Sequence, residues 1–348
     1  MLAVGLRTYI VTRILLTIPT LLLLLSMVFL VMRVLPGDPV ALHFEKKADP
    51  AAMERMRQIL GLNKPLWIQY VDYLGGIVDI GYFLQHGYPN LGKSMQTFED
   101  VGGQIFSAFP ATLELAIYSM IIACVLGVLL GVLASKSYHS IADHTVRIFG
   151  TVTYAIPVFF LGIVFQLIFS IYLRWLPSGQ RISPLVEPPA TITGLYTIDS
   201  LLEGNLYKFA ESVKALILPS LTLGIILSGM FVRLTRTNML ETSRLDFVTA
   251  ARARGLKEST VTYGYVLRNA FLPVLTMMGL QFALLLGGAI LTETTFSWPG
   301  LGRYIFERIS FRDYTAIQGA IVMFGLFVAL VSLIVDILYA YFDPRIRL

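Results

Sequence analysis

Six runs of mostly apolar, uncharged residues constrain this chain more than any other feature of its sequence. A helix needs about 20 such residues to cross a hydrocarbon core of roughly 30 Å. Lipid offers the backbone no hydrogen-bond partners, so each run must close its own bonds as a helix. The sequence therefore predicts an all-α, polytopic membrane protein with six transmembrane helices. The six runs are Ile14–Met32, Leu115–Ser135, Ile148–Leu173, Ala215–Val232, Asn269–Thr292 and Tyr314–Val335.

The composition excludes the soluble and disordered classes. Of 348 residues, 56% are hydrophobic and 14% are charged, whereas soluble domains carry about 25% charged residues. The first apolar run follows Arg7 and Arg13, as in a secretory signal peptide. However, it is longer than the usual apolar region of such a peptide, and Arg33–Pro36 replaces a small-residue cleavage site. We therefore expect the first run to be retained as a span.

The distribution of Lys and Arg predicts the orientation. An even number of spans places both termini on one side, together with segments 136–147 and 233–268. Positive charge is densest in 233–268, and cytoplasmic loops carry the excess of Lys and Arg. The chain is thus expected in a prokaryotic inner membrane, multi-pass, with cytoplasmic N- and C-termini.

Three regions follow from this topology. Residues 1–32 hold the N-terminus and the first span, 33–110 form an extracytoplasmic helical insert, and 111–348 form a core with five spans. Within the insert, Asp49-Pro50 is typical of a helix start and Gly61 of a helix end. A second helix is expected near Pro65, with Trp67, Tyr70, Val71 and Leu74 on one face. That face could pack on the outer ends of the spans or dock an external protein.

The two longer loops of the core differ in character. The outer loop 174–214 is rich in Pro and Gly and is expected to lack regular structure for most of its length. The inner loop 233–268 predicts a short helix, capped by Asp246 and ended by Gly255. Ala250 and Ala251 would allow close approach of a partner backbone. From the residues alone, a partner-docking helix and an amphipathic linker on anionic lipid remain equally open.

The stretch Gly87–Ser94 matches the phosphate-binding pattern G-x-x-x-x-G-K-[ST]. Such a loop follows a buried strand, but the preceding residues are polar. Pro89 also removes one of the N–H groups that would cradle phosphate. We therefore interpret the match as coincidental.

Other chemical signals are sparse. Glu114 and Asp336 are possible intramembrane polar residues, but each lies close enough to an interface to pair or to extend toward water. Gly127-x-x-x-Gly131 is typical of a helix-packing notch. No catalytic or metal-binding constellation is evident, so we expect no enzyme activity, no cofactor in this chain and no nucleic-acid partner.

Several motifs together resemble the inner-membrane permease subunits of the peptide/nickel branch of ABC importers. They occur in the same order along nearly the whole chain, and the long insert is more similar to the first ("B") permease of the pair. The motifs are Leu35–Pro39, Leu60–Leu62, Pro65–Leu66, Pro110–Ala116, Ala251–Leu256, Leu267–Ala270, Phe296–Gly302, and Asp336, Tyr339 and Asp343–Arg345.

This resemblance implies a type I ABC importer permease fold. It also implies that the 246–258 segment carries the E-A-A-x-x-x-G signature that docks into an ATPase subunit. Thr249 stands in place of the glutamate, and Arg268 stands where the general pattern has proline. The docking residues are then Asp246, Thr249, Ala250, Ala251, Arg252, Arg254, Gly255 and Leu256.

The resemblance further implies import of dipeptides or oligopeptides. The partners would be a second paralogous permease, two ATPases that bind ATP and Mg²⁺, an extracytoplasmic substrate-binding protein and the bilayer. Nickel chelates or oligosaccharides are alternative cargoes of the same machinery. A stand-alone secondary transporter is a remote alternative, which inverted repeats and buried ion-binding carboxylates would favour.

Overall fold

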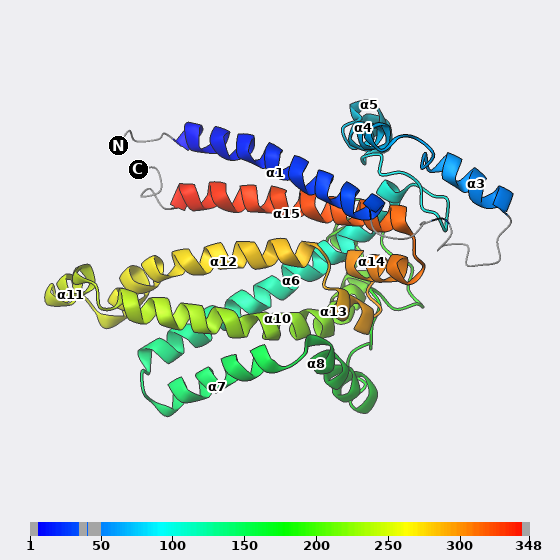
Figure 1. The fold of residues 1–348 in the computed structure, drawn as a ribbon. Helices are drawn as coiled ribbons and strands as arrows, with labels where there is room; N and C mark the ends of the chain where they lie inside the picture. The colour runs from blue at the N-terminus through cyan, green and yellow to red at the C-terminus, as the bar shows by residue number, and fades with distance from the viewer. Residues whose placement is uncertain (1–5, 35–39, 41–49, 343–348) are drawn as a thin grey trace.

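The computed structural model describes residues 6–34, 40 and 50–342, which are helical for most of their length (Figure 1). The motifs Leu35–Pro39 and Asp343–Arg345, the cap residue Asp49 and the side chain of Tyr339 lie outside the described part. Within it, five helical segments are long and apolar enough to cross a membrane. They are α1 (Leu6–Val34), α6 (Val101–Lys136), α10 (Leu206–Thr242), η3 (Thr260–Leu267) with α12 (Arg268–Leu286), and α15 (Tyr314–Phe342).

The predicted span Ile148–Leu173 is broken instead of straight. It consists of α7 (Ile141–Ala155), α8 (Val158–Phe165) and the wider π-helical turns of η2 (Gln166–Tyr172), with a bend of 102° after α7. Pro157 cannot donate a backbone hydrogen bond and disfavours helical geometry in the preceding residue. Ile156 is accordingly extended, at φ −74° and ψ 126°. The bent pair brings the number of candidate spans in the described chain to six.

The predicted span Asn269–Thr292 also differs from the structure. It ends at Leu286 and continues backwards through η3 to Thr260. Gly288 adopts φ +97° directly afterwards, a conformation that other residues rarely adopt. The chain then forms two short helices, α13 (Ile290–Thr295) and α14 (Leu301–Ser310), before entering α15.

The insert and the outer loop contain several short helices in addition to the membrane spans. The insert contains α3 (Pro50–Ile59), α4 (Leu66–Ile77) and α5 (Ile80–His86), which confirms helices that start at Pro50 and near Pro65. In the loop 174–214, α9 (Tyr196–Leu202) forms, and α10 begins at Leu206 instead of Ala215. Most of that loop was expected to be irregular, so this expectation was only partly correct.

The face of α4 predicted from Trp67, Tyr70, Val71 and Leu74 packs on the spans only in part. The Tyr70 ring does pack on Phe29 of α1, at 5.2 Å between centroids. However, Trp67 and Val71 are 69% and 60% exposed. Gln69 and Tyr73 complete the packed face instead, and the Tyr73 ring lies 5.5 Å from that of Phe29.

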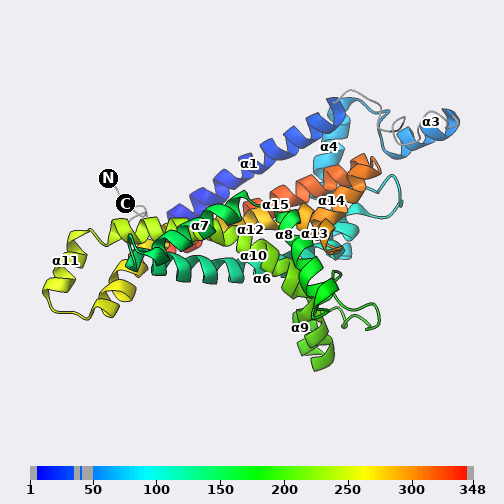
Figure 2. The ribbon, with the colours of Figure 1, turned by 90° about the horizontal axis from the view of Figure 1, so that it is seen from below.

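The helices α6 and α10 form the centre of the bundle. A Cβ atom on Gly131 would lie 2.6 Å from the Thr235 Cβ, and one on Gly127 would collide with Phe231. These contacts confirm the predicted small-residue notch. Both described ends of the chain lie at the same end of the bundle as α11 (Asp246–Ala253). We call this the α11 end and the opposite one the α14 end (Figures 1 and 2).

Candidate functional site

The helix α11 lies at the extreme tip of the bundle, beyond the end of α10 (Figure 1). It is connected to α10 on one side and, through η3, to α12 on the other. A rigid displacement of α11 would therefore be transmitted directly to two membrane-spanning segments.

One face of α11 packs against the protein's own core. Val248 and Ala251 are 0% and 4% exposed. They belong to a buried apolar cluster that we call the α11 seat, which joins α11 to the ends of α6, α10 and η3. The α11 seat consists of Val132, Met239, Val248, Ala251, Val261, Val266 and Ala270.

The opposite face of α11 is exposed. Asp246, Thr249, Ala250 and Ala253 are spaced at helical intervals and all are exposed. The face carries one carboxylate, one hydroxyl and two methyl groups, so a partner backbone could approach closely. We call it the α11 outer face.

One sequence expectation about α11, the Asp246 cap, was wrong. Leu245 occupies the N-cap position without a side-chain cap, and Asp246 is the first helical residue. A carboxylate in the first turn is stabilised by the positive end of the helix dipole. It does not, however, accept a hydrogen bond from a backbone N–H as a cap would. Ala251, which is also among the predicted docking residues, faces the α11 seat and is 4% exposed.

The end of α11 is fixed by a glycine turn and an ion pair. Gly255 adopts φ +76° and donates its N–H to the Arg252 carbonyl at 2.9 Å, which confirms the expected terminating glycine. Arg252 binds Glu258 with two hydrogen bonds, of 2.8 and 3.2 Å. The hydrogen bond from Arg252 lowers the pKa of the Glu258 carboxyl below its ordinary value. Arg254 and Leu256 are exposed beside this turn.

At the α14 end, Glu114 forms a buried ion pair. Its Oε2 accepts two hydrogen bonds from Arg181, at 2.6 and 3.1 Å, and its Oε1 accepts two from Thr197. The side chains of Glu114 and Arg181 are only 2% and 7% exposed. The Arg181 guanidinium also lies 3.7 Å from the ring centroid of Tyr196. The expected pairing of Glu114 is thus present, and it ties the outer loop to α6.

A second buried carboxylate at the α14 end was missed by sequence analysis. Glu293 is fully buried and accepts hydrogen bonds from the Thr112 hydroxyl at 2.8 Å and the Arg303 N–H at 3.0 Å. Burial raises the pKa of this carboxyl above its ordinary value, while the hydrogen bond from Arg303 acts in the opposite direction. Its position three residues before the Phe296–Gly302 motif was the only available signal.

The same contacts bring two distant motifs together. Trp298 Nε1 donates to the Ala111 carbonyl at 2.8 Å, and the Leu301 N–H donates to the Thr112 hydroxyl at 2.7 Å. A Cβ on Gly300 would lie 2.5 Å from both Thr112 Oγ1 and Glu293 Oε2. The motifs Pro110–Ala116 and Phe296–Gly302 therefore form one structural unit, which we call the α14 knot.

The phosphate-loop match forms part of the same end of the molecule. The helix α5 precedes it, not a strand. Ser94 is buried and donates its hydroxyl to Asp313, which is also buried and accepts from the Met95 N–H at 3.1 Å. The segment is therefore a structural connection to the start of α15.

Asp336 pairs with Arg13 of α1 at 3.2 Å, with the two side chains 35% and 45% exposed. The second candidate intramembrane carboxylate is therefore also paired, near the α11 end. Within the described residues, no group of three His, Cys, Asp or Glu side chains could hold a metal ion.

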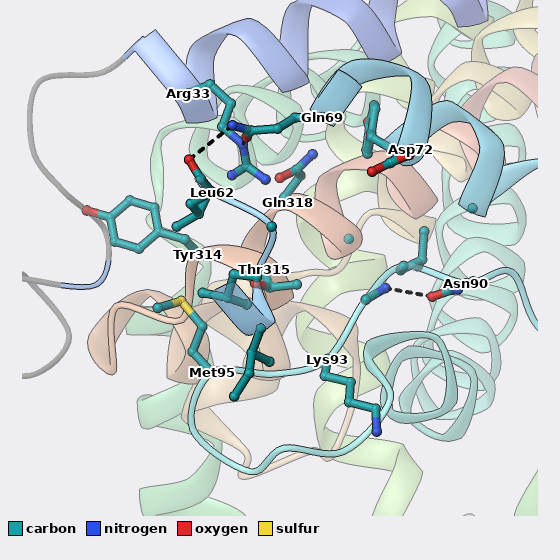
Figure 3. A pocket seen from close by; sticks show the side chains of 18 residues that line it. Arg33, Leu62, Gln69, Asp72, Asn90, Lys93, Met95, Tyr314, Thr315 and Gln318 are labelled. Atoms are coloured by element: carbon teal, nitrogen blue, oxygen red, sulfur yellow. Dashed lines mark hydrogen bonds between the residues drawn. The ribbon is translucent and has the colours of Figure 1, made fainter. Parts of the chain in front are cut away.

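Next to the α14 knot, a cavity of about 520 Å³ separates the insert from α15. Arg33, Gln69 and Asp72 lie on its insert side, and Thr315 and Gln318 lie on its α15 side (Figure 3). Arg33 Nε donates to Gln69 Oε1 at 2.9 Å, and Gln69 Nε2 donates to the Leu62 carbonyl at 3.3 Å, the dashed line that ends at Leu62 in Figure 3. This cavity, lined by both polar and apolar residues, lies where the insert meets the bundle.

Two family models match this chain and together cover most of it. Residues 127–348 match the model described as "Binding-protein-dependent transport system inner membrane component". Residues 6–116 match the corresponding N-terminal model of the transport-system membrane component. The matched ranges include α11, α13, α14 and the insert.

The chain is similar to several curated proteins over nearly its whole length. It is 39% identical to the dipeptide transport system permease protein DppB of Alkalihalophilus pseudofirmus, covering 97% of this chain and 99% of that one. It is 40% identical to the di/tripeptide transport system permease protein DppB of Pseudomonas aeruginosa, covering 98% of each. The glutathione transport system permease protein GsiC of Escherichia coli is 36% identical, over 97% of this chain and 98% of that one.

Among solved structures, the fold is similar to a chain of the MetNI methionine ABC transporter in an inward-facing conformation. The TM-score is 0.52 at 15% identity, and the match covers 69% of this chain and 97% of that one. At this identity the likeness concerns the fold alone. It agrees with the expected ABC importer permease fold.

Proposed function

Since this chain belongs to the inner-membrane components of binding-protein-dependent transport systems, we propose that it is a permease subunit of an ATP-driven dipeptide importer. The names of the dipeptide and di/tripeptide relatives, at 39% and 40% identity, support the cargo class. The same machinery carrying nickel chelates or oligosaccharides remains the alternative.

The observation that carries the proposal is the two-faced construction of α11. Its seat holds it to the protein, while every residue of its outer face is exposed. We infer that an ATPase subunit covers the α11 outer face. ATP and Mg²⁺ would bind to the partners, and this chain would act without enzyme activity or a cofactor of its own.

The packing of α10 supports a transmission route. The notch glycines place α10 in close contact with α6, and the α11 seat includes Met239 of α10 and Val132 of α6. Movement of α11 would therefore carry these two helices together. A second, paralogous permease would complete the path, and the two would alternate between outward- and inward-facing states as rigid bodies.

Under this proposal the α11 end is cytoplasmic. Segment 33–110 would face an extracytoplasmic binding protein, and 111–348 would be the permease core. Orientation can be tested with impermeant maleimide on intact cells, in a Cys124→Ser background. We expect Lys93→Cys to react and Ser259→Cys not to react, since both positions are exposed but lie at opposite ends. The reverse pattern would invert the topology. Ser94 would be an unsuitable position because it is buried.

The coupling role is tested by Ala250→Asp on the α11 outer face. The chain is reconstituted in vesicles with a second permease, the ATPases and the binding protein. We expect loss of most dipeptide-stimulated ATP hydrolysis and uptake, because a new carboxylate would be desolvated at the interface. The stability of the variant should be unchanged.

The matched control is Ala210→Asp, an exposed helical alanine at the opposite end of α10, which should retain coupling. Full stimulation in Ala250→Asp would contradict docking at α11. Stimulation by a nickel chelate or an oligosaccharide, but not by a dipeptide, would contradict the proposed cargo and leave the docking role intact.

A further inference from the structure

The helices α4 and α5 lie across the bundle, not along it. In Figure 2, α4 crosses beneath the outer end of α1, and in Figure 1 both helices are confined to that end. Because α1 spans the membrane, a helix that crosses it runs along the membrane plane. The depth of α4 relative to the bilayer then decides what surrounds it.

Contacts with α1 set this depth from one side. The Tyr70 hydroxyl bonds Ser26 at 2.6 Å, and Gln69 accepts from Arg33 at 2.9 Å. Ser26 lies about 10 Å inward from Arg33 along a helix that rises ~1.5 Å per residue. Arg33 is the first charged residue after the uncharged run of α1. The inner face of α4 is therefore level with the last turns of the apolar span.

The cavity beside α15 sets the same depth independently. Tyr73 and Gly76 of α4 line it together with Thr315 and Gln318, from the first two turns of α15 (Figure 3). The apolar span of α15 begins at Tyr314. Contacts with two neighbouring spans, α1 and α15, thus place α4 at the boundary of the hydrocarbon layer.

A large part of the remaining α4–α5 surface is apolar and exposed, although Asp79, Gln85 and His86 are exposed beside it. On α4, exposed Trp67 and Val71 lie at helical spacing on the side away from Gln69, whereas Leu66 is exposed in the first turn on the same side as Gln69. On α5, the exposed apolar residues occupy positions i, i+3 and i+4. The members of this surface, which we call the α4–α5 stripe, are Leu66, Trp67, Val71, Val78, Ile80, Phe83 and Leu84, at 57, 69, 60, 68, 70, 47 and 78% exposure.

We propose that α4 and α5 form an interfacial anchor, with the α4–α5 stripe immersed in lipid at the membrane face opposite α11. The adjoining helix α1 also exposes apolar side chains, with Leu23, Met27 and Leu30 at 65, 61 and 55% exposure. Amphipathic helices at this depth bury their apolar side about 5–10 Å into the boundary between headgroups and acyl chains. Tryptophan favours the same layer, which accounts for exposed Trp67. The anchor would hold the insert at a fixed height above the bundle.

The proposal is tested with bimane-labelled single cysteines at Val71, Ile80 and Leu84, in a Cys124→Ser background. The full chain is assembled with its partner subunits in lipid nanodiscs. We expect strong quenching by nitroxide-bearing lipid and loss of most of the quenching by aqueous iodide. Asn63→Cys, exposed in the turn before α4, is the control and should show the opposite pattern.

Iodide quenching at the stripe positions equal to that at Asn63 would overturn the proposal. Shielding that appears only after the extracytoplasmic binding protein is added would also overturn it, in favour of a protein-docking surface. Elution of each labelled assembly at the unlabelled volume verifies folding, and labels at three positions on two helices guard against the failure of one variant. The quenching results do not depend on the identity of the transported solute, so they test the anchor separately from the proposed dipeptide import.

Discussion

Short helices lie at the tips of the spans at both ends of the bundle, but different interactions hold them in place at each end. At the α14 end, polar groups are buried: the Glu114–Arg181 pair has side chains 2% and 7% exposed, and Glu293 is fully buried. At the α11 end, the seat that holds α11 is apolar, and the Arg252–Glu258 pair beside it is 47% and 63% exposed. The buried Asp143–Arg236 pair at this end joins α7 to α10 and does not hold α11.

This difference separates a rigid end from a receptive one. Buried charges with complete hydrogen bonding allow one arrangement only, because any shift would leave a charge without a partner. An apolar seat with an exposed polar rim holds a helix without specifying what covers its other face. The α14 knot would therefore keep the spans in register while α11 receives a partner.

The largest effect is expected for Glu114→Ala at the rigid end. Arg181 would remain buried without its carboxylate, so we expect a loss of about 3–5 kcal/mol in the free energy of unfolding. Thermal unfolding of the purified chain with its partner subunits measures this loss. In the control Lys64→Ala, removing the exposed ion pair with Asp72 (50% and 52% exposed) should change it by less than about 1 kcal/mol. Equal effects would remove the distinction between buried and exposed pairs.

A smaller effect is expected for Gly300→Ala in the α14 knot. The new methyl group would lie 2.5 Å from Thr112 Oγ1 and Glu293 Oε2, and overpacking of this kind costs about 1–3 kcal/mol. The same thermal measurement applies. Gly75→Ala is the matched control, since a Cβ there meets no atom within 4 Å. If Gly300→Ala unfolded at the temperature of Gly75→Ala, the knot would not be tightly packed.

The smallest effect on stability is expected for Arg252→Ala at the receptive end. Its exposed pair with Glu258 is screened by water, and the α11 seat remains intact, so the unfolding temperature should not change measurably. Dipeptide-stimulated ATP hydrolysis should nevertheless fall, because Arg252 fixes the turn after α11. A large drop in unfolding temperature would show that the ion pair, and not the seat, holds α11.

Sequence reasoning succeeded where the evidence was local. Apolar run length predicted the spans within α1, α6, α10 and α15, and Gly255 and Pro50 marked helix ends. It failed where a single proline or glycine redirected the chain, as at Pro157 and Gly288. The angle of each change in direction depends on tertiary packing, which the sequence does not specify.

By itself, the sequence determined the membrane class, the family resemblance and the approximate place of the spans, because bilayer thickness and lipid's lack of hydrogen-bond partners act on each segment separately. Only the tertiary structure decided which helix faces are covered and which charges meet. Glu114 and Arg181 are hydrogen-bonded although they are separated by 67 positions in the sequence. Thr112 and Glu293 are hydrogen-bonded across a separation of 181 positions. Such pairings depend on the packing of several helices at once, and no spacing within one segment encodes them.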